Sequence, residues 1–303
     1  MKRIIALSLG AILLLPLVSC RRDSMTPEEA KAALRQPVTF TASIDNYAQV
    51  KGTDESFEEG DAIGLYAADP FNLVNVRAVV KGNYVKPLMP FEWEMVRTAV
   101  FVAYYPYDPS YKDESRKTFS VMSDQRTYEA YKASDLRAAV ALGKNGETVE
   151  LPFHHMLSKL TVLVRCEDSA EQVTSVILGG VATSVTADFA EAAVETAGGR
   201  GDLQAGKAVA GNGNEGYVAI LVPQTLSELP IMVATNKGQT LVFQPDKPLS
   251  FEPGHAYVTS TLTVPKQEGP GPGPGPGKEL TFSVSITDWA DGGTMDFHKG
   301  KTN

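Results

Sequence analysis

Short runs in which apolar and polar residues alternate constrain the fold of this chain more than any other feature. Residues 38–44 and residues 280–286 each alternate with period two over seven positions. Successive side chains of a strand point to opposite faces, so these runs predict half-buried β-strands. Short apolar runs recur between them, separated by Gly and Pro, and strongly helical stretches are few. The sequence therefore predicts an all-β fold of many short strands and turns.

The spacing of these runs predicts two tandem β-sandwich domains. The first spans residues 37–165 and the second residues 166–268, because the apolar runs become shorter after Cys166. Residues 269–277 then alternate strictly between Gly and Pro. Pro lacks a backbone N–H and Gly disfavours order, so this segment is predicted to be a semi-extended spacer. Residues 278–303 follow it as a separate tail, which carries the second alternating strand.

The first twenty residues predict export and lipid attachment. Lys2 and Arg3 precede an almost wholly apolar run that ends in Leu-Val-Ser-Cys. Residues 1–19 therefore fit a signal peptide, and Cys20 stands where bacterial lipoproteins are cleaved and acylated. Acyl chains contribute about 0.8 kcal/mol per buried methylene, so a Cys20 that carries palmitate or similar chains is expected to hold the protein at a membrane. Residues 20–36 are expected to be a spacer.

The composition argues against several classes of function. The formal charge is −8, and it falls to −10 when Lys2 and Arg3 leave with the signal peptide. An acidic body does not favour nucleic acid as a partner. The sequence contains no nucleophile elbow, phosphate-binding loop or dinucleotide fingerprint. Adjacent His154 and His155 would point to opposite faces of a strand, which is poor geometry for a metal. We therefore expect neither an enzyme nor a cofactor or metal site.

The strand in the tail needs a partner for its backbone N–H and C=O groups. Two arrangements are open. The strand pairs with its own domain, or it reaches a neighbouring molecule and adds to an open sheet, as in donor-strand complementation. In the second arrangement the side chains that fill pockets would be Leu280, Phe282, Val284, Ile286 and Trp289.

Four segments, spread over almost the whole chain, together resemble one family. They are the box that ends at Cys20, residues 57–66 (FEEGDAIGLY), residues 151–160 (LPFHHMLSKL) and residues 286–293 (ITDWADGG). In this order they are similar to segments of the fimbrillin family, in its Mfa-like branch, whose members are subunits of type V pili. The resemblance implies two transthyretin-like β-sandwich domains, export as a lipoprotein to the outer membrane surface, and other fimbrial subunits as partners.

The resemblance also implies a maturation step. In the stalk subunits of the family, a trypsin-like protease cuts after a basic residue near the first strand, and a strand of the next subunit fills the groove left behind. On this sequence the candidate cut follows Lys51, where many relatives carry Arg, and the tail would be the donor strand. Arg35 lies before the first strand, so a cut there would leave it in place. The removable strand would carry Val38, Phe40, Ala42 and Ile44.

Two hypotheses about the role of the protein follow. A subunit that keeps its first strand cannot accept a donor but can still donate its tail, which favours a tip or accessory subunit of a fimbrium over a stalk subunit. Such a subunit would adhere to a host or bacterial surface. The alternative is a surface glycan-binding lipoprotein, in which Tyr104, Tyr105 and Tyr107 would form an aromatic platform. Only the first hypothesis needs a terminal strand that can move.

Overall fold

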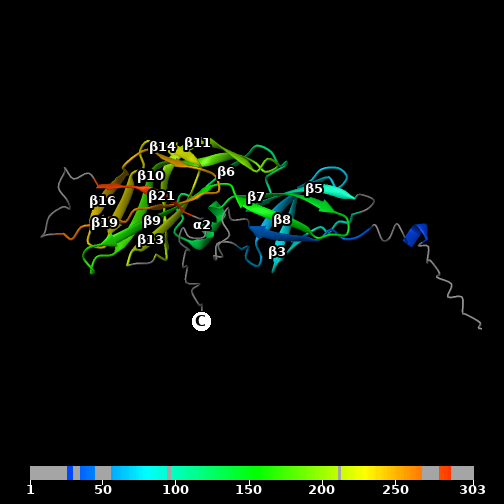
Figure 1. The fold of residues 1–303 in the computed structure, drawn as a ribbon, viewed down its shortest axis with the longest axis horizontal. Coiled ribbons are helices and arrows are strands. Elements are labelled where there is room, and N and C mark those ends of the chain that lie inside the picture. The colour runs from blue at the N-terminus through cyan, green and yellow to red at the C-terminus, as the bar shows by residue number, and fades with distance from the viewer. Residues whose placement is uncertain are drawn as a thin grey trace, which may run out of the picture.

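The computed structural model describes residues 26–29, 35–44, 56–93, 97–210, 213–267 and 280–287. Two bodies of strands lie end to end along the long axis of the molecule, and helix α2 (Tyr128–Ser134) sits near their junction (Figure 1). Almost every other described element is a strand, so the predicted all-β fold is confirmed. The transthyretin-like character of the domains stays a prediction.

Seven strands of the N-terminal half close into a barrel. Their order around it is β1-β4-β3-β2-β5-β7-β8. Large aromatic side chains fill its interior, and Trp93, Phe101 and Phe153 are fully buried there. The strands are β1 (Phe40–Ile44), β2 (Ala62–Ala67), β3 (Leu73–Lys81), β4 (Tyr84–Pro87), β5 (Thr98–Tyr105), β7 (Arg137–Lys144) and β8 (Val149–His155).

The second body contains two six-stranded sheets. The first, ordered β11-β10-β15-β16-β20 with β6 beside β10, comprises β6 (Lys117–Ser120), β10 (Val173–Asp188), β11 (Ala193–Gln204), β15 (Ile231–Thr235), β16 (Thr240–Pro245) and β20 (Leu280–Phe282). The second, ordered β12-β13-β9-β18-β21 with β19 beside β9, comprises β9 (Ser158–Cys166), β12 (Gly206–Ala208), β13 (Glu215–Leu221), β18 (Ala256–Thr259), β19 (Leu262–Val264) and β21 (Val284–Thr287). A small sheet pairs β14 (Gln224–Leu226) with β17 (Leu249–Phe251).

One apolar core joins the two large sheets. Val176 and Leu178 of β10 and Leu160 and Val162 of β9 are all fully buried in it. Alternate residues of each strand point inward, as the period-two pattern requires. The core therefore sits between two layers, which is the architecture of a β-sandwich.

The chain passes from the barrel to the second body between β8 and β9. β9 pairs with β13 and so belongs to the second body, whereas the sequence placed the domain boundary at residue 166. β6 lies between the barrel strands β5 and β7 in the chain, but it belongs to the second body because it pairs with β10. Residues 198–204, which include Gly198, Gly199 and Gly201, extend β11 along β10. An apolar pattern identifies a strand but does not identify the strand that pairs with it. For that reason the sequence predicted the strands but assigned β9 to the wrong body.

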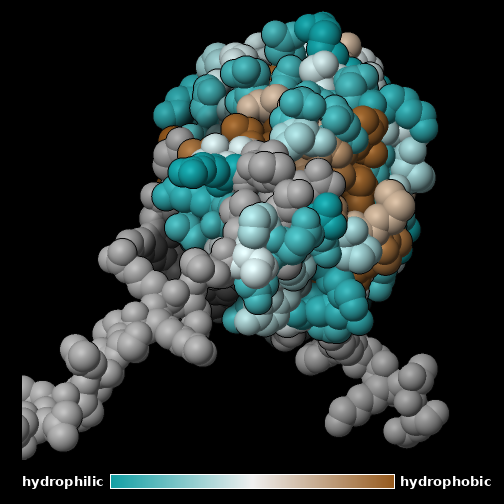
Figure 2. All heavy atoms as spheres, turned by 90° about the vertical axis from the view of Figure 1, so that its right-hand side faces the viewer, coloured by the Kyte–Doolittle hydropathy of each residue, from teal (hydrophilic) through white to brown (hydrophobic). Residues whose placement is uncertain are grey.

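The surface is mostly hydrophilic, with hydrophobic side chains gathered along one side of the barrel end (Figure 2). The barrel strands β5 and β7 contribute two exposed apolar neighbours, Val100 and Leu142, which face each other across the ladder. Within the described ranges, no helix is both long and apolar enough to span a membrane.

Candidate assembly site

The first strand of the barrel is paired unequally on its two sides. β1 runs parallel to β8 over its whole length, from Phe40 opposite Val149 to Ile44 opposite Phe153. On the other side it meets β4 at only two positions, where Phe40 faces Val85 and Thr41 faces Tyr84. Residues 42–44 therefore have ladder partners on β8 alone, among the residues that the structure describes.

The apolar face of β1 points into the barrel, as the sequence predicts. Phe40 is 1% exposed, and its ring packs edge-on against Phe101 with 5.0 Å between centroids. Val38 is also buried, while Ala42 and Ile44 are half-buried against the same core. Each fully buried large side chain contributes roughly 1.5–3 kcal/mol, so β1 is held mainly by its first half.

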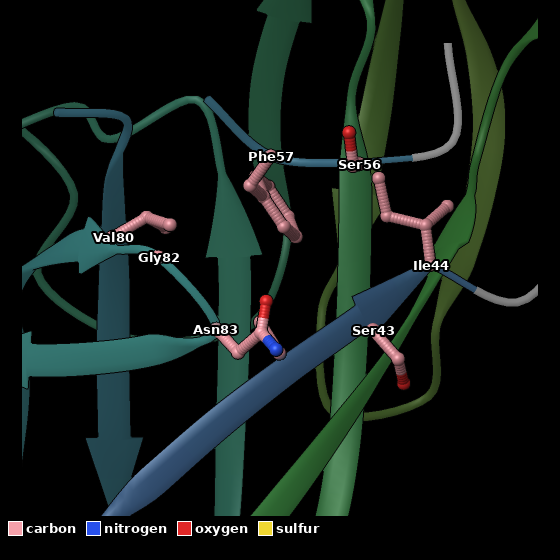
Figure 3. A pocket seen from close by; sticks show the side chains of 8 residues that line it. Ser43, Ile44, Ser56, Phe57, Val80, Gly82 and Asn83 are labelled. Atoms are coloured by element: carbon pink, nitrogen blue, oxygen red, sulfur yellow. The ribbon is translucent and has the colours of Figure 1, made fainter. Parts of the chain in front are cut away.

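A pocket of about 80 Å³ lies beside the second half of β1. Ala42 and Ile44 line one side of it, and Val80 and Asn83 line the other. Phe57 reaches into the space from the segment that precedes β2 (Figure 3). The pocket occurs where β4 has ended, so the barrel wall is incompletely filled next to Ala42.

The strand in the tail pairs with its own chain, and it does so in two pieces. β20 runs parallel to β16, with Leu280 opposite Phe243. β21 runs antiparallel to β18, with Val284 opposite Thr259. Between them Ser283 accepts a hydrogen bond from the Ser260 N–H at 2.7 Å. The tail therefore lies on the outer edges of both sheets and crosses from one to the other at Ser283.

This crossing changes which tail residues are buried. Phe282 is 2% exposed and joins the core of the second body. Leu280 and Val284 are only partly buried, and Ile286 is 68% exposed. The alternation predicted one strand with four apolar side chains on a single face. The structure breaks it in two, and Ile286 packs into no core among the described residues.

Three predicted site residues lie outside the described residues: Cys20, Lys51 and Trp289. Arg35 is described and exposed, just ahead of β1. The lipid-attachment and cleavage assignments therefore remain predictions.

A buried polar cluster, which the sequence did not reveal, lies where the two bodies join. Asp135 follows α2, and its carboxylate accepts hydrogen bonds from Arg137 Nε at 2.9 Å and contacts His155 Nδ1 at 2.7 Å. Burial alone would raise the pKa of Asp135, but Arg137 and His155 outweigh it and lower its pKa to about 2. Burial also lowers the pKa of His155, although Asp135 opposes this. The cluster joins three segments of the junction, which is a structural role.

Two further predictions about surface chemistry can be compared with the structure. Tyr104 and Tyr105 are 0% and 5% exposed, so they pack in the interior and do not form an aromatic platform for a sugar. His154 is half-buried while its neighbour His155 is buried, as expected for opposite faces of a strand. No cluster of three or more metal-ligating side chains occurs within the described part of the chain.

The fold and sequence were compared with known proteins. A family model described as fimbrillin-like matches residues 50–289. A candidate cell adhesion protein from Bacteroides ovatus has a similar structure, with a TM-score of 0.61 and 17% identity over 84% of this chain and 96% of that chain. One from Bacteroides uniformis gives a TM-score of 0.60 and 18% identity over 84% of this chain and 99% of that chain. No curated protein sequence matches the chain.

These likenesses to solved structures establish a shared fold. The family match is the stronger finding, because it covers well over half of the chain and extends from the segment before β2 to the end of β21. Two of the four segments that carried the resemblance, residues 57–66 and 151–160, lie wholly within it, and a third lies within it as far as residue 289. The chain therefore belongs to the fimbrillin-like family.

Proposed function

We propose that this chain is a structural or adhesive subunit of a surface fimbrium that assembles by β-augmentation, with its tail as the donor strand. The fimbrillin-like family makes it a fimbrial or adhesin protein that assembles with other fimbrial subunits, and not an enzyme. The observation that carries the donor role is the placement of the tail. β20 and β21 occupy sheet edges, and Ile286 is exposed, so the tail can leave without dividing the sheets.

The state of β1 decides whether the subunit can also accept a strand. With β1 in place the barrel is closed, and no groove is free between β4 and β8. A chain that keeps β1 donates but does not accept, which favours a tip or accessory position. Lys51 supports this assignment, because a protease specific for Arg would leave the connection between β1 and β2 intact.

A signal peptide over residues 1–19 and a lipid-modified Cys20, both predicted from the sequence, support the same setting. A lipid-modified Cys20 would tether the chain to the outer membrane through a spacer ahead of β1, with the barrel exposed at the cell surface. A cut after Lys51 would release that tether together with β1. Release from the membrane and removal of β1 would thus both follow from one cut.

Deletion of residues 278–303 in the producing cell tests the donor role. We expect the truncated protein to reach the surface as a folded monomer but to be missing from fimbriae sheared from the cells. The matched control is Ser285→Ala, which keeps the apolar face of the tail. Fimbriae that incorporate the truncated chain at the normal level would exclude the tail as donor.

N-terminal sequencing of the assembled protein tests its position in the fimbrium. A start at lipidated Cys20 is expected for a tip or accessory subunit that keeps β1. A start at Gly52 would instead show that the first strand has been removed and would assign a stalk role.

A further inference from the structure

The exposed apolar side chains of this protein are concentrated on the barrel. Among the described residues, seven of the eleven large apolar side chains that are exposed belong to the barrel. Isolated exposed apolar residues are normal on any protein surface, but a gathered set marks a contact surface. The non-aromatic members that are more than half exposed are Val74, Leu88, Met89, Val100 and Leu142.

Two of these side chains lie side by side on the outer wall of the barrel. Val100 of β5 faces Leu142 of β7 across the ladder, and they are 52% and 64% exposed. Their neighbours Phe101 and Ala141 pack against the barrel core, so Val100 and Leu142 point outward. Figure 2 looks onto this end of the barrel and shows hydrophobic side chains gathered along one side of it.

Val74 extends this apolar surface beyond β2. Ala67 of β2 faces Phe101 on one side and Leu73 on the other. Val100 precedes Phe101 and Val74 follows Leu73, so the two valines lie on either side of the end of β2. Leu73 packs against the barrel core, and Val74 is 59% exposed. Strands β3, β5 and β7 thus each contribute an outward apolar side chain near the same end of the barrel.

The chain that leads from the predicted lipid anchor enters the barrel at this end. Val38 N donates a hydrogen bond to Phe91 O at 3.0 Å, and Phe91 lies two residues after Met89. Thr39 O accepts one from Val149 N at 2.8 Å, just beyond the turn that ends β7. Exposed apolar side chains therefore stand near the entry point both on the segment after β4 and on β7.

We propose that this end of the barrel docks onto the lipid bilayer to which Cys20 is attached. The docking surface, called the apolar rim below, consists of Val74, Leu88, Met89, Val100 and Leu142. This inference rests on the proposed lipid anchor and adds the orientation of the folded protein on the membrane. The second body, which lies at the other end of the long axis, would point away from the bilayer (Figure 1).

The tether favours a bilayer as the occupant of the apolar rim. Fifteen residues lead from Cys20 to Arg35. A fully extended chain of that length spans about 50 Å at most, so the bilayer is always within reach of the barrel. Because the tether enters the barrel beside the rim, it gives the rim a high effective concentration at the lipid surface. A modest apolar contact is then enough for docking.

Apolar burial, and not charge, would drive this docking. The exposed side chains of Arg97 and Lys144 near the rim are matched by those of Glu92 and Glu147. The chain as a whole is acidic, so anionic headgroups would not attract it. Each Å² of apolar surface removed from water contributes about 25 cal/mol. Docking should therefore depend little on salt.

Fluorescence quenching at a bilayer tests this orientation. The chain begins at residue 21, carries an N-terminal histidine tag in place of the lipid, and binds phosphatidylcholine vesicles that contain a nickel-chelating lipid. Cys166→Ser leaves one introduced Cys for an environment-sensitive fluorophore. Glu147→Cys places the fluorophore in the turn after β7, and Ser169→Cys places it in the turn after β9, in the second body. Both positions are exposed.

We expect spin-labelled lipids to quench the fluorophore at position 147 and not the one at position 169, with little change in about 0.5 M NaCl. The pair Val100→Asp and Leu142→Asp should lower the quenching at position 147 by roughly fivefold or more, because it removes apolar surface from the rim. The matched control is the pair Val209→Asp and Val242→Asp, which are similarly exposed outside the barrel and should leave the quenching unchanged.

A second rim variant guards against loss of the fold. Val100→Thr with Leu142→Thr removes apolar surface from the same positions, and Thr suits a strand. It should also lower the quenching while the melting temperature stays unchanged. Equal quenching at positions 147 and 169, no quenching at position 147, or quenching that neither rim variant lowers would overturn the proposal. A dimer in sedimentation that the rim variants dissociate, without any quenching, would assign the rim to a second copy of the chain instead.

The outcome also separates this proposal from the one that it rests on. Because the histidine tag replaces the lipid, the quenching does not depend on whether the cell modifies Cys20. Mass spectrometry of the protein from its own cells tests the anchor. An unmodified Cys20 would refute the lipid anchor and leave the rim as a membrane-binding surface, whereas a lipidated Cys20 without quenching would leave the anchor and refute the docking.

Discussion

At the scale of single residues, Ala42 is the position where β1 fits its groove least well. Replacing Ala42 by Val places two methyl groups beside the 80 Å³ pocket. At about 0.8 kcal/mol for each buried carbon, the free energy of unfolding should rise by up to roughly 1.5 kcal/mol. Chemical denaturation measures the change. After a cut following Lys51, the same variant should also lose β1 from the barrel more slowly.

Thr41→Ile is the matched control for this substitution, because Thr41 is the preceding residue of β1 and is not among the residues that line the pocket. It adds a similar volume on the opposite face of the strand, so little stabilisation is expected. If both variants are equally stable, space at Ala42 does not limit the fit of β1.

His155 makes the stability of the protein depend on pH. Burial lowers the pKa of His155 below its usual value of 6.5, so the folded protein keeps it neutral where the unfolded chain binds a proton. Stability should therefore fall as the pH drops below about 6.5, by up to roughly 1.4 kcal/mol per pH unit, until the pKa of the folded state is reached. The free energy of unfolding measured between pH 7.5 and 5 checks this.

The variant His155→Asn should remove that slope, because Asn can still donate to Asp135 and does not titrate. His154→Asn is the control, since His154 lies on the other face of β8. Asp135 acts at lower pH: its pKa of about 2 means that its contribution is lost only as the pH falls from about 4 to 2. A slope near pH 6 that survives in His155→Asn would contradict the assignment.

At the scale of elements, β1 and the tail should respond differently to the same truncation. Phe40 is 1% exposed inside a closed barrel, so Phe40→Ala should cost about 3–5 kcal/mol of global stability. Phe282 is as deeply buried, but it lies on an edge strand that can undock by itself. The cost of Phe282→Ala is then limited to the free energy of docking the tail. In Phe282→Ala, amide hydrogen exchange should become faster in residues 280–287 alone.

Some of this arrangement could be predicted from the sequence, and some could not. Alternation identified β1 and its inward face, because the period of a strand is a local property. The crossing at Ser283 depends on β16 and β18, whose edges the tail joins, and no local pattern encodes that choice. Gly weakens strands, so the local composition of residues 198–204 does not favour a strand, yet the ladder with β10 holds them in one. The partner of His155 was missed because Asp135 is distant in sequence and local spacing does not link the two.

At the scale of the whole molecule, a stacked pair of rings fixes the second body against the barrel. Phe189 follows β10, and its ring lies parallel to that of Tyr104 on β5, 4.4 Å between centroids and 3° between planes. Tyr104 is anchored in turn by a hydrogen bond from its hydroxyl to Asn75 Oδ1 at 2.7 Å. Gly64 permits this packing, because a Cβ at that position would overlap the Tyr104 ring. The two bodies are therefore expected to unfold together.

Phe189→Ala tests this coupling between the bodies. Removing the ring should cost about 3–5 kcal/mol and should split one cooperative thermal transition into two, because Phe189 packs on Tyr104 of β5, where the core of the second body continues onto the barrel. Phe243→Ala is the control: Phe243 is 2% exposed within the second body, so it should lower the stability by a similar amount without separating the barrel from the sheets. Differential scanning calorimetry distinguishes the cases. A single transition in Phe189→Ala, lowered as in Phe243→Ala, would mean that the remaining contacts of the junction, the polar cluster around Asp135 among them, are enough to hold the bodies together.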